Sequence, residues 1–174
     1  ELSQRSIHRA LHATVETSRG VIYGLGMCLP NVREMEFLYP IPEGGHDPLS
    51  LPGGVSLERG FIKGYIDYVF EWNERVYFVD WKSDVLERYD EGALRRHFVS
   101  NYDTQALLYT LALCKLYGLE DEAAYEACFG GSIYVFLRGV TEDSVHGIHQ
   151  HRASWSALEV FAEQLASPDM GVYR

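Results

Sequence analysis

The stretch GFIKGYIDYVFEWNERVYFVDWKS, from Gly60 to Ser83, decides the fold of this chain. It holds two runs rich in β-branched and aromatic residues, and the polar residues Asn73 and Glu74 separate them. Two such runs with a two-residue polar break are typical of antiparallel strands joined by a tight turn. We therefore expect a β-hairpin here and a β-sheet around it.

The register of this hairpin places acidic residues opposite each other. If the turn has two residues, Trp72 faces Arg75, and the same register brings Asp67 opposite Asp80. Opposed side chains have Cβ atoms about 4.5–5.5 Å apart, where two like charges are destabilising unless a cation neutralises them. Lys82 lies two residues beyond Asp80, so the period of a strand puts its ammonium on the same face. Two carboxylates and one lysine are thus expected to converge.

This constellation suits phosphodiester hydrolysis. A hard cation such as Mg²⁺ binds carboxylate oxygens, polarises a phosphoryl oxygen and lowers the pKa of a bound water. A neighbouring lysine can hold the attacking water or offset charge in the transition state. From spacing alone, the alternative is that Asp67 and Asp80 are solvent-facing strand residues with Lys82 as their ion-pair partner. A slipped register would also move the pairing, because Asn-Glu is a weaker turn signal than Asn-Gly.

The rest of the chain carries both helical and β patterns, which indicates an α/β fold. The predicted helices are residues 4–17, residues 101–117 with Gly118 as C-cap, and a last helix from the N-cap Ser154 to about Leu165. The predicted strands outside the hairpin are Arg33–Tyr39 and residues 132–138. Residues 20–30 are predicted as a turn region, 40–60 as loop, and 84–100 as irregular or briefly helical chain.

The composition is that of one soluble globular domain. The chain has 174 residues, of which 47% are hydrophobic and 23% charged, enough for a single core. It has no apolar run of about 18 residues, so no membrane span is expected. Three cysteines without CxxC spacing fit neither a disulfide framework nor a thiolate metal site and favour a reducing cytoplasm.

The net charge of -10 restricts how this chain could bind DNA. Phosphate contacts need Lys and Arg, and an acidic protein is repelled by a duplex at long range. Any DNA must therefore be delivered to the chain or gripped locally. The one local basic cluster in the sequence consists of Arg88, Arg95, Arg96 and His97.

Four ordered blocks of the sequence resemble a known nuclease family. The hairpin reads GFIKGYID and then VYFVDWKS, which is the Asp, then Asp-x-Lys signature of the PD-(D/E)xK nuclease superfamily. The other blocks are REMEFLYPI at Arg33–Ile41, DTQALLY at Asp103–Tyr109 and FGGSIYVFLRGV at Phe129–Val140. In the same order, they look like stretches of the C-terminal nuclease domain of RecB-type recombination nucleases, the exodeoxyribonuclease V beta subunits. The resemblance covers about residue 33 to residue 140.

The resemblance implies a fold and a metal site. The implied fold is α/β, a restriction-endonuclease-like central mixed sheet flanked by helices on both sides. Asp67, Asp80 and the backbone carbonyl of Trp81 are the implied ligands of Mg²⁺, which Mn²⁺ could replace. Lys82 is the implied catalytic lysine.

Gln105 and Tyr109 match the Gln-x-x-x-Tyr motif of the family and join the implied catalytic set. They lie four residues apart on a predicted helix, so both project from one face and could reach the substrate or the metal. The alternative is an ordinary helix face, with one polar residue and one aromatic residue packed on the sheet.

The implied activity is that of a magnesium-dependent exodeoxyribonuclease. Residues 1–174 are expected to form a single nuclease domain, a fragment of a larger helicase-nuclease that acts in double-strand break repair and recombination in the bacterial cytoplasm. The implied partners are linear single- and double-stranded DNA, the helicase portion of the same polypeptide, other subunits of the complex and a recombinase, with no membrane.

Two other functions are weighed against this one. The first is a protein-interaction domain that keeps the nuclease fold and docks a recombinase, and the intact set of site residues argues against this as the sole role. The second is a CRISPR- or phage-type nuclease with an iron–sulfur cluster. Cys28, Cys114 and Cys128 cannot supply the usual four thiolates of such a cluster.

One family feature has no convincing match here. The family's site usually includes a metal-binding histidine on a helix well upstream of the first aspartate, and we expect that the chain begins after it. The local alternative is the pair His8 and His12, which are four residues apart on a predicted helix. Either Glu34 or Glu36 is expected to add a carboxylate to the site. The histidines His146, His149 and His151 follow a predicted strand in a polar stretch, so we expect them in an exposed loop.

Overall fold

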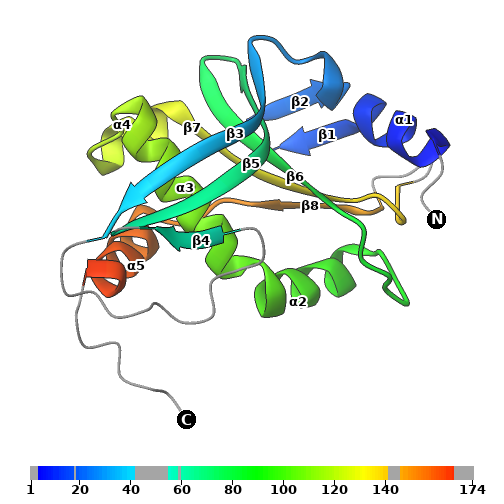
Figure 1. Ribbon diagram of the computed structural model, residues 1–174. Helices are drawn as coiled ribbons and strands as arrows, with labels where there is room; N and C mark the ends of the chain where they lie inside the picture. Colours follow the sequence, from blue (N-terminus) through cyan, green and yellow to red (C-terminus); the bar gives the residue numbers. More distant parts are fainter. Residues whose placement is uncertain (1–3, 18, 42–54, 59, 141–145, 167–174) are drawn as a thin grey trace.

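A six-stranded mixed β-sheet forms the centre of the molecule (Figure 1). The computed structural model describes residues 4–17, 19–41, 55–58, 60–140 and 146–166. The strand order is β3-β5-β6-β7-β8, and β4 also pairs with β5. The bounds are β3 Asn31–Pro40, β4 Val55–Glu58, β5 Phe61–Trp72, β6 Arg75–Lys82, β7 Phe129–Phe136 and β8 Ile148–His151. Strands β6 and β7 run parallel and the other pairs of this sheet are antiparallel.

Helices and a small second sheet cover the two faces of the central sheet. They are α1 Gln4–His12, β1 Thr14–Thr17, β2 Gly20–Tyr23, the 3-10 helix η1 Leu25–Met27, α2 Glu91–Asn101, α3 Asp103–Tyr117, α4 Glu122–Cys128 and α5 Trp155–Ala166. Leu94, Leu113 and Leu158 of the later helices belong to one apolar core. Ala10 and Val15 of the N-terminal layer belong to a second core. The predicted α/β architecture, with layers on both faces of a mixed sheet, is confirmed.

The hairpin of β5 and β6 has the predicted register. Its ladder pairs Trp72 with Arg75 and continues to Tyr68 and Val79. Asn73 and Glu74 form the turn with φ angles of 49° and 61°. Positive φ at both central residues is required in a type I′ turn, whose twist matches that of the flanking strands. The turn therefore sets the register even without the usual glycine.

Strand β5 loses its regular alternation at Asp67. Ile66 and Tyr68 are two residues apart, yet they pack in different cores, whereas Ile66 and Val69 share one. In the register of β3 with β5, Glu34 and Asp67 fall between the pairs Arg33–Tyr68 and Met35–Ile66 and are not themselves paired. Glu34 also has a φ of 49°, in the left-handed region. The break changes the direction in which the strand presents Asp67.

Helix ends and the buried strand follow local rules. Gly118 ends α3 with a φ of 65°, as predicted for a C-cap. The hydroxyl of Ser154 accepts a hydrogen bond of 3.2 Å from the Ala157 amide, as predicted for the N-cap of α5. All eight residues of β7 are buried, which fits a strand in the interior of a sheet with a parallel neighbour.

Several predictions at the N-terminus and in the loops are wrong in detail. The helix predicted over 4–17 ends at His12, because β1 follows it and pairs with β2. The region 20–30 therefore contains a strand and a 3-10 helix. Residues 42–54 of the predicted loop lie outside the described residues, and 55–58 form β4. Within 84–100, the chain is helical from Glu91, because the Asp90 side chain caps α2 through the Ala93 amide at 3.2 Å.

The prediction of an exposed histidine loop is wrong for two of its three members. His149 and His151 belong to β8, and both rings pack on Phe98 of α2, with ring centroids 4.6 and 4.8 Å away. His146 is exposed. The three residues do not act as one cluster, because the strand fixes two of them against a helix.

None of the described helices is both long and apolar enough to cross a membrane.

Candidate active site

Asp80 and Lys82 lie at the end of β6, where the strand leaves the hairpin ladder. Asp80 is only 4% exposed, and its Oδ1 atom is 2.6 Å from the Nζ atom of Lys82. The two side chains are two residues apart on a strand and meet on one face, as the period of two requires. The ammonium of Lys82 is itself largely buried, with 13% of its side chain exposed. This ion pair is therefore an interior feature and not a solvated surface pair.

Helix α3 contributes Gln105 and Tyr109 to the site. The Nζ atom of Lys82 donates to Oε1 of Gln105 at 3.0 Å. The Gln105 amide nitrogen donates in turn to the Tyr109 hydroxyl at 3.1 Å, and both residues are buried. The helical spacing of four thus aligns the two polar groups behind the lysine. The simple alternative, a helix face that only packs on the sheet, does not account for the bond to Lys82.

Tyr102 forms an aromatic wall beside the lysine. The Nζ atom of Lys82 lies 4.1 Å from the centroid of the Tyr102 ring and 5.6 Å from that of Tyr134. A cation over an aromatic face at this distance gains electrostatic attraction, more so where water is excluded. The Lys82 ammonium is therefore held by the Asp80 carboxylate, the Gln105 amide oxygen and the Tyr102 ring.

Asp84 extends the site towards α2. Its Oδ1 atom accepts a hydrogen bond of 2.7 Å from the Tyr102 hydroxyl and lies 2.9 Å from Nε2 of His97. The Asn101 amide contacts the other ring nitrogen of His97 at 3.2 Å. Neither Tyr102 nor Asp84 was predicted from the sequence as a site residue. The signal was present, because Asp84 continues the period of two that links Asp80 and Lys82.

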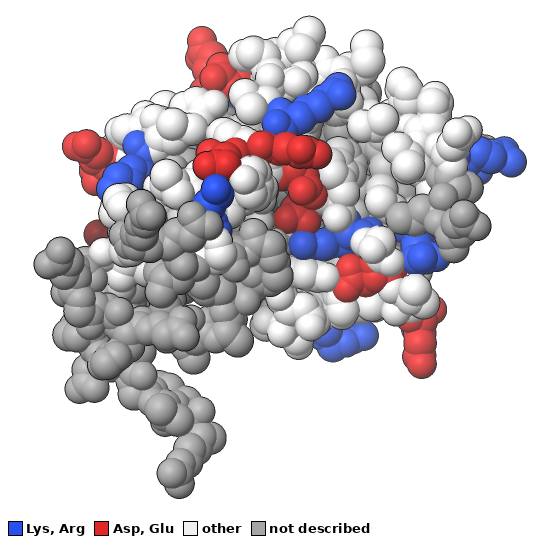
Figure 2. All heavy atoms as spheres, in the orientation of Figure 1, with Lys and Arg blue, Asp and Glu red and all other residues white. Residues whose placement is uncertain are grey.

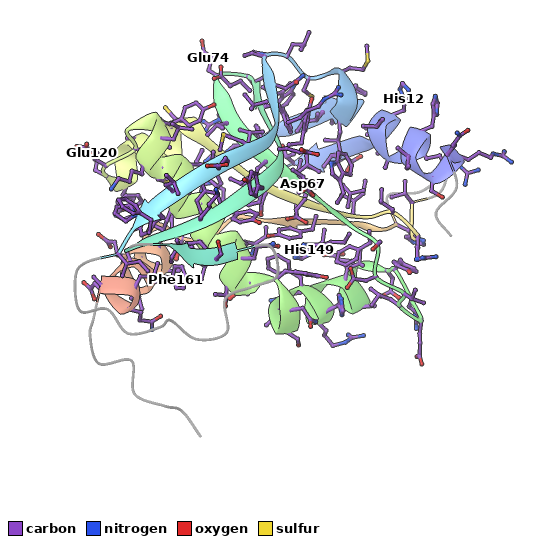
Figure 3. All side chains as sticks on the ribbon, viewed as in Figure 1. His12, Asp67, Glu74, Glu120, His149 and Phe161 are labelled. Atoms are coloured by element: carbon purple, nitrogen blue, oxygen red, sulfur yellow. The ribbon has the colours of Figure 1, made fainter. Side chains whose placement is uncertain are left out.

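Asp67 reaches the site differently from what a regular ladder predicts. Its Oδ2 atom accepts a hydrogen bond of 2.9 Å from the backbone amide of Trp81, the residue between Asp80 and Lys82. Counted from the turn, the last pair of the β5–β6 ladder is Tyr68 with Val79, so Asp67 lies just beyond the end of the ladder. Figure 3 shows Asp67 near the middle of the sheet, well away from Glu74 at the turn of the hairpin. The Asp67 carboxylate is thus hydrogen-bonded to the backbone of β6, and Asp67 is not paired with Asp80 in the ladder.

The electrostatics of Asp80 are dominated by the burial of its carboxylate. Burial raises the pKa of Asp80 to about 6, with Lys82 opposing the rise and the charges of Asp67 and Asp84 adding to it. Burial also raises the pKa of Asp84, but hydrogen bonds from Tyr102 and His97 outweigh it and hold the pKa below its usual range. Figure 2 shows acidic side chains gathered near the middle of the visible face, with basic side chains around them.

Tyr109 is arranged as a hydrogen-bonding phenol. Burial raises its pKa, and the charge of Asp80 raises it further, whereas the bond from Gln105 opposes the rise. The hydroxyl therefore keeps its proton at neutral pH. It can accept from Gln105 and still donate its own proton towards the site.

The donor set would suit a hard cation with few protein ligands. Among the residues that the structure describes, no three side chains of His, Cys, Asp and Glu form a group that could hold a metal ion. Asp67 and Asp80 offer two carboxylates, and a bound cation would offset the cost of burying the charged form of Asp80. Mg²⁺ commonly uses one or two protein carboxylates and keeps several waters. The residues present fit such an ion.

Four further candidate ligands were considered from the sequence, the alternative pair His8 and His12 and the glutamates Glu34 and Glu36. The rings of His8 and His12 contact each other in α1 with centroids 4.2 Å apart and an interplanar angle of 42°, and Figure 3 shows His12 at a distance from Asp67. Glu36 is exposed and accepts from the Tyr65 hydroxyl at 2.7 Å. Glu34 is exposed but stands beside Asp67 in the strand register. Of the two glutamates, Glu34 is the one that the backbone brings near the site.

Known proteins share much of this sequence. The RecBCD enzyme subunit RecB of Escherichia coli is 38% identical over 157 residues, which is 76% of this chain and 13% of that protein. The same subunit from Haemophilus influenzae is 38% identical over 102 residues, which is 55% of this chain and 8% of that protein. The subunit from Mycolicibacterium smegmatis is 32% identical over 120 residues, covering 59% of this chain and 11% of that protein.

These similarities cover between 55 and 76% of this chain. No family model matches the chain. The chain spans only a small part, 8 to 13%, of the curated relatives described above. The resemblance to RecB predicted from the motifs is confirmed: over much of its length, this chain is similar in sequence to these RecB subunits.

Proposed function

We propose that this chain is a metal-dependent DNA nuclease module that hydrolyses phosphodiester bonds. One observation carries the proposal. Lys82 is held between Asp80 at 2.6 Å and Gln105 at 3.0 Å, with Asp67 bound to the intervening backbone. A buried lysine among carboxylates, in a chain similar to RecB, supports hydrolysis better than it supports a structural ion pair.

In this proposal, Asp67, Asp80 and the backbone carbonyl of Trp81 hold the metal ion, Mg²⁺ or, as a substitute, Mn²⁺. When bound, the ion supplies Lewis-acid polarisation of the phosphoryl group and a water of lowered pKa. The set fits the PD-(D/E)xK pattern of the sequence. It leaves open coordination positions for water and phosphate oxygens, because Mg²⁺ prefers six oxygen ligands.

Lys82 orients the nucleophile and offsets charge on the phosphoryl oxygens. Its ammonium carries three donors, and Asp80 and Gln105 engage it without enclosing it fully. Gln105 fixes the direction of the ammonium, and Tyr109 fixes Gln105. Such preorganised donors lower the barrier because they need no rearrangement during the reaction.

The negative net charge of the chain favours a nuclease module that acts as part of a larger complex. A protein with a net charge of -10 binds DNA poorly from solution, so a motor that delivers the strand would help it. The relatives are named as subunits of the RecBCD enzyme. We propose likewise that a helicase portion of the same polypeptide and other subunits bring linear DNA, single- or double-stranded, to this site during break repair. Docking of a recombinase stays a prediction that no contact in the structure favours.

The proposal is tested by cleavage of linear single- and double-stranded DNA by this chain and by the longer polypeptide proposed above. Cleavage should require Mg²⁺ or Mn²⁺ and stop in chelator. Lys82→Ala should abolish it, and Lys115→Ala, which removes an exposed charge at the end of α3, should not. Metal-independent cleavage, or no cleavage by the longer polypeptide with either ion, would overturn the assignment.

A further inference from the structure

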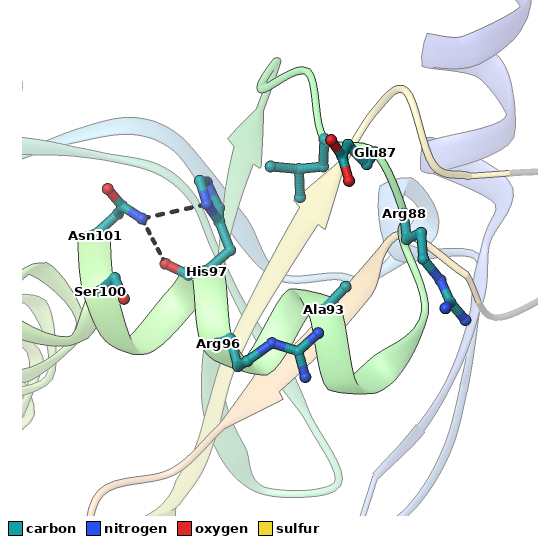
Figure 4. A pocket seen from close by; sticks show the side chains of 8 residues that line it. Glu87, Arg88, Ala93, Arg96, His97, Ser100 and Asn101 are labelled. Carbon is teal, nitrogen blue, oxygen red and sulfur yellow. Dashed lines mark hydrogen bonds between the residues drawn. The ribbon is translucent and has the colours of Figure 1, made fainter.

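A pocket beside the candidate active site lies between helix α2 and the loop that follows β6 (Figure 4). Its volume is about 460 Å³, and it is open to solvent. The residues that line it are Leu86, Glu87, Arg88, Ala93, Arg96, His97, Ser100 and Asn101. The pocket coincides with most of the only basic cluster that the sequence shows.

The charges of the pocket favour an anion. Arg88 and Arg96 contribute two guanidinium groups, and Glu87 is the one carboxylate in the lining. Arg88 pairs with Asp90 at 2.7 Å, but its side chain is 77% exposed, so that pair is screened by solvent. Arg96 is exposed and has no ion-pair partner within the described part of the chain. A planar guanidinium without a partner is suited to bidentate contact with a phosphate.

The pocket and the reactive centre share a wall. His97 lines the pocket, and its Nε2 atom is 2.9 Å from Asp84. Asp84 accepts from the Tyr102 hydroxyl at 2.7 Å, and the Tyr102 ring lies 4.1 Å from the ammonium of Lys82. Two side chains therefore separate the pocket from the lysine. Figure 4 shows His97 and Asn101 at one end of the pocket, with Arg96 and Arg88 further along.

We propose that this pocket binds the backbone phosphate of a DNA strand next to the phosphodiester that is cut. The inference rests on the proposed nuclease function. An acidic chain must hold DNA through a local group of cations, and this pocket supplies two beside the reactive centre. The neutral hydroxyl of Ser100 adds hydrogen-bonding capacity for phosphate or sugar oxygens.

The helix offers a matched control for this assignment. Arg95 is the neighbour of Arg96 on α2 and is also exposed, but it lines a different pocket with Glu91 and His149. Arg95→Ala and Arg96→Ala make the same change in net charge on the same helix. Glu87→Gln makes the opposite change within the pocket. A local phosphate site must therefore respond differently to the three variants.

The test is the affinity of this chain for a short single-stranded oligodeoxynucleotide, measured by fluorescence anisotropy in chelator at several salt concentrations. Arg96→Ala should weaken binding and make the slope of log affinity against log salt shallower by about 0.7, the value for one lost phosphate contact on a single strand. Arg95→Ala should change the slope much less, and Glu87→Gln should tighten binding. Circular dichroism verifies that each variant is folded.

Equal losses in Arg95→Ala and Arg96→Ala would overturn the inference, because they would show long-range charge and not a site. An unchanged slope in Arg96→Ala would do the same. Binding in chelator needs no metal and no cleavage, so it reports on the pocket alone. Cleavage by the Lys82→Ala variant reports on the reactive centre, and the two proposals can therefore fail separately.

Discussion

The two ends of the β5–β6 hairpin follow different rules. At the turn end, the ladder is regular, and Phe70 and Tyr77 stack with ring centroids 5.4 Å apart. At the open end, the ladder stops, Asp67 bonds to a backbone amide, and Asp80 is buried with a raised pKa. Apart from the positive φ of its two turn residues, the turn end satisfies local preferences, whereas the open end violates several of them at once. Violations of this kind are expected where a protein keeps a functional site at the expense of stability.

The largest expected effect is a difference in DNA cleavage between a substitution at the open end of the hairpin and one at its turn end. Lys82→Ala should lower metal-dependent DNA cleavage at least about 100-fold, the scale for loss of one preorganised group that stabilises the transition state. Arg75→Ala at the turn end should leave cleavage nearly unchanged, although it removes a hydrogen bond of 2.7 Å to the Glu126 carbonyl. Steady-state cleavage rates of both variants decide this. Normal cleavage by folded Lys82→Ala protein would contradict the comparison.

The second prediction concerns the stability cost of the open end. The folded pKa of Asp80 is about 6, above the ordinary value of 3.8, so the folded state binds the proton more tightly than the unfolded state. The protonated Asp80 carboxyl adds to the free energy of unfolding. This contribution is fully present below pH 3.8 and is lost as the pH rises through about 6. A shift of about two pKa units corresponds to at most about 3 kcal/mol.

Asp80→Asn in chelator should therefore be no less stable than the unsubstituted chain at pH 8. The unsubstituted chain should recover relative stability as the pH falls from 6 towards 4. Urea unfolding of both proteins across this range measures the difference. A clear loss of stability in Asp80→Asn at pH 8 would mean that the ion pair with Lys82 is structural.

The third prediction sharpens the role of the aromatic wall. Tyr102→Leu removes the ring that lies 4.1 Å from the Lys82 ammonium. If the ring holds the ammonium by a desolvated cation–π contact of about 2 kcal/mol, cleavage should fall by roughly 10- to 30-fold. Tyr102→Phe keeps the ring and loses only the bond to Asp84, so it should retain most of the activity. Equal losses in both variants would assign the effect to the hydroxyl and not to the ring.

The regular end of the hairpin could be predicted from sequence because a tight turn determines which residues pair. The polar pair Asn73–Glu74 was sufficient to place Trp72 opposite Arg75. Helix α3 with its cap at Gly118 could be predicted for a similar reason, since its signals are local. Local preferences also placed Lys82 on the face of Asp80.

The open end could not be predicted fully because it depends on a neighbouring strand. The break at Asp67 lies where Glu34 of β3 adopts a positive φ, and no pattern within β5 reveals it. The contribution of Asp84 depends on Tyr102 and on His97, which α2 places beside it. Strand β8 was missed because its four residues, IHQH, carry too little apolar alternation to predict a strand.

The smallest expected effect tests the turn end itself. Glu74 adopts a φ of 61°, which costs a residue with a Cβ about 1 kcal/mol and costs glycine nothing. Glu74→Gly should therefore stabilise the hairpin by up to about 1 kcal/mol, less the greater freedom of glycine in the unfolded chain. Glu74→Gln is the matched control, because it removes the same charge and keeps the Cβ. Thermal unfolding should place Glu74→Gly above Glu74→Gln, and cleavage should be the same in both, since Figure 3 shows Glu74 far from Asp67. If Glu74→Gly melts below Glu74→Gln, the positive φ is not a source of strain. The regular end of the hairpin would then already be at its optimum.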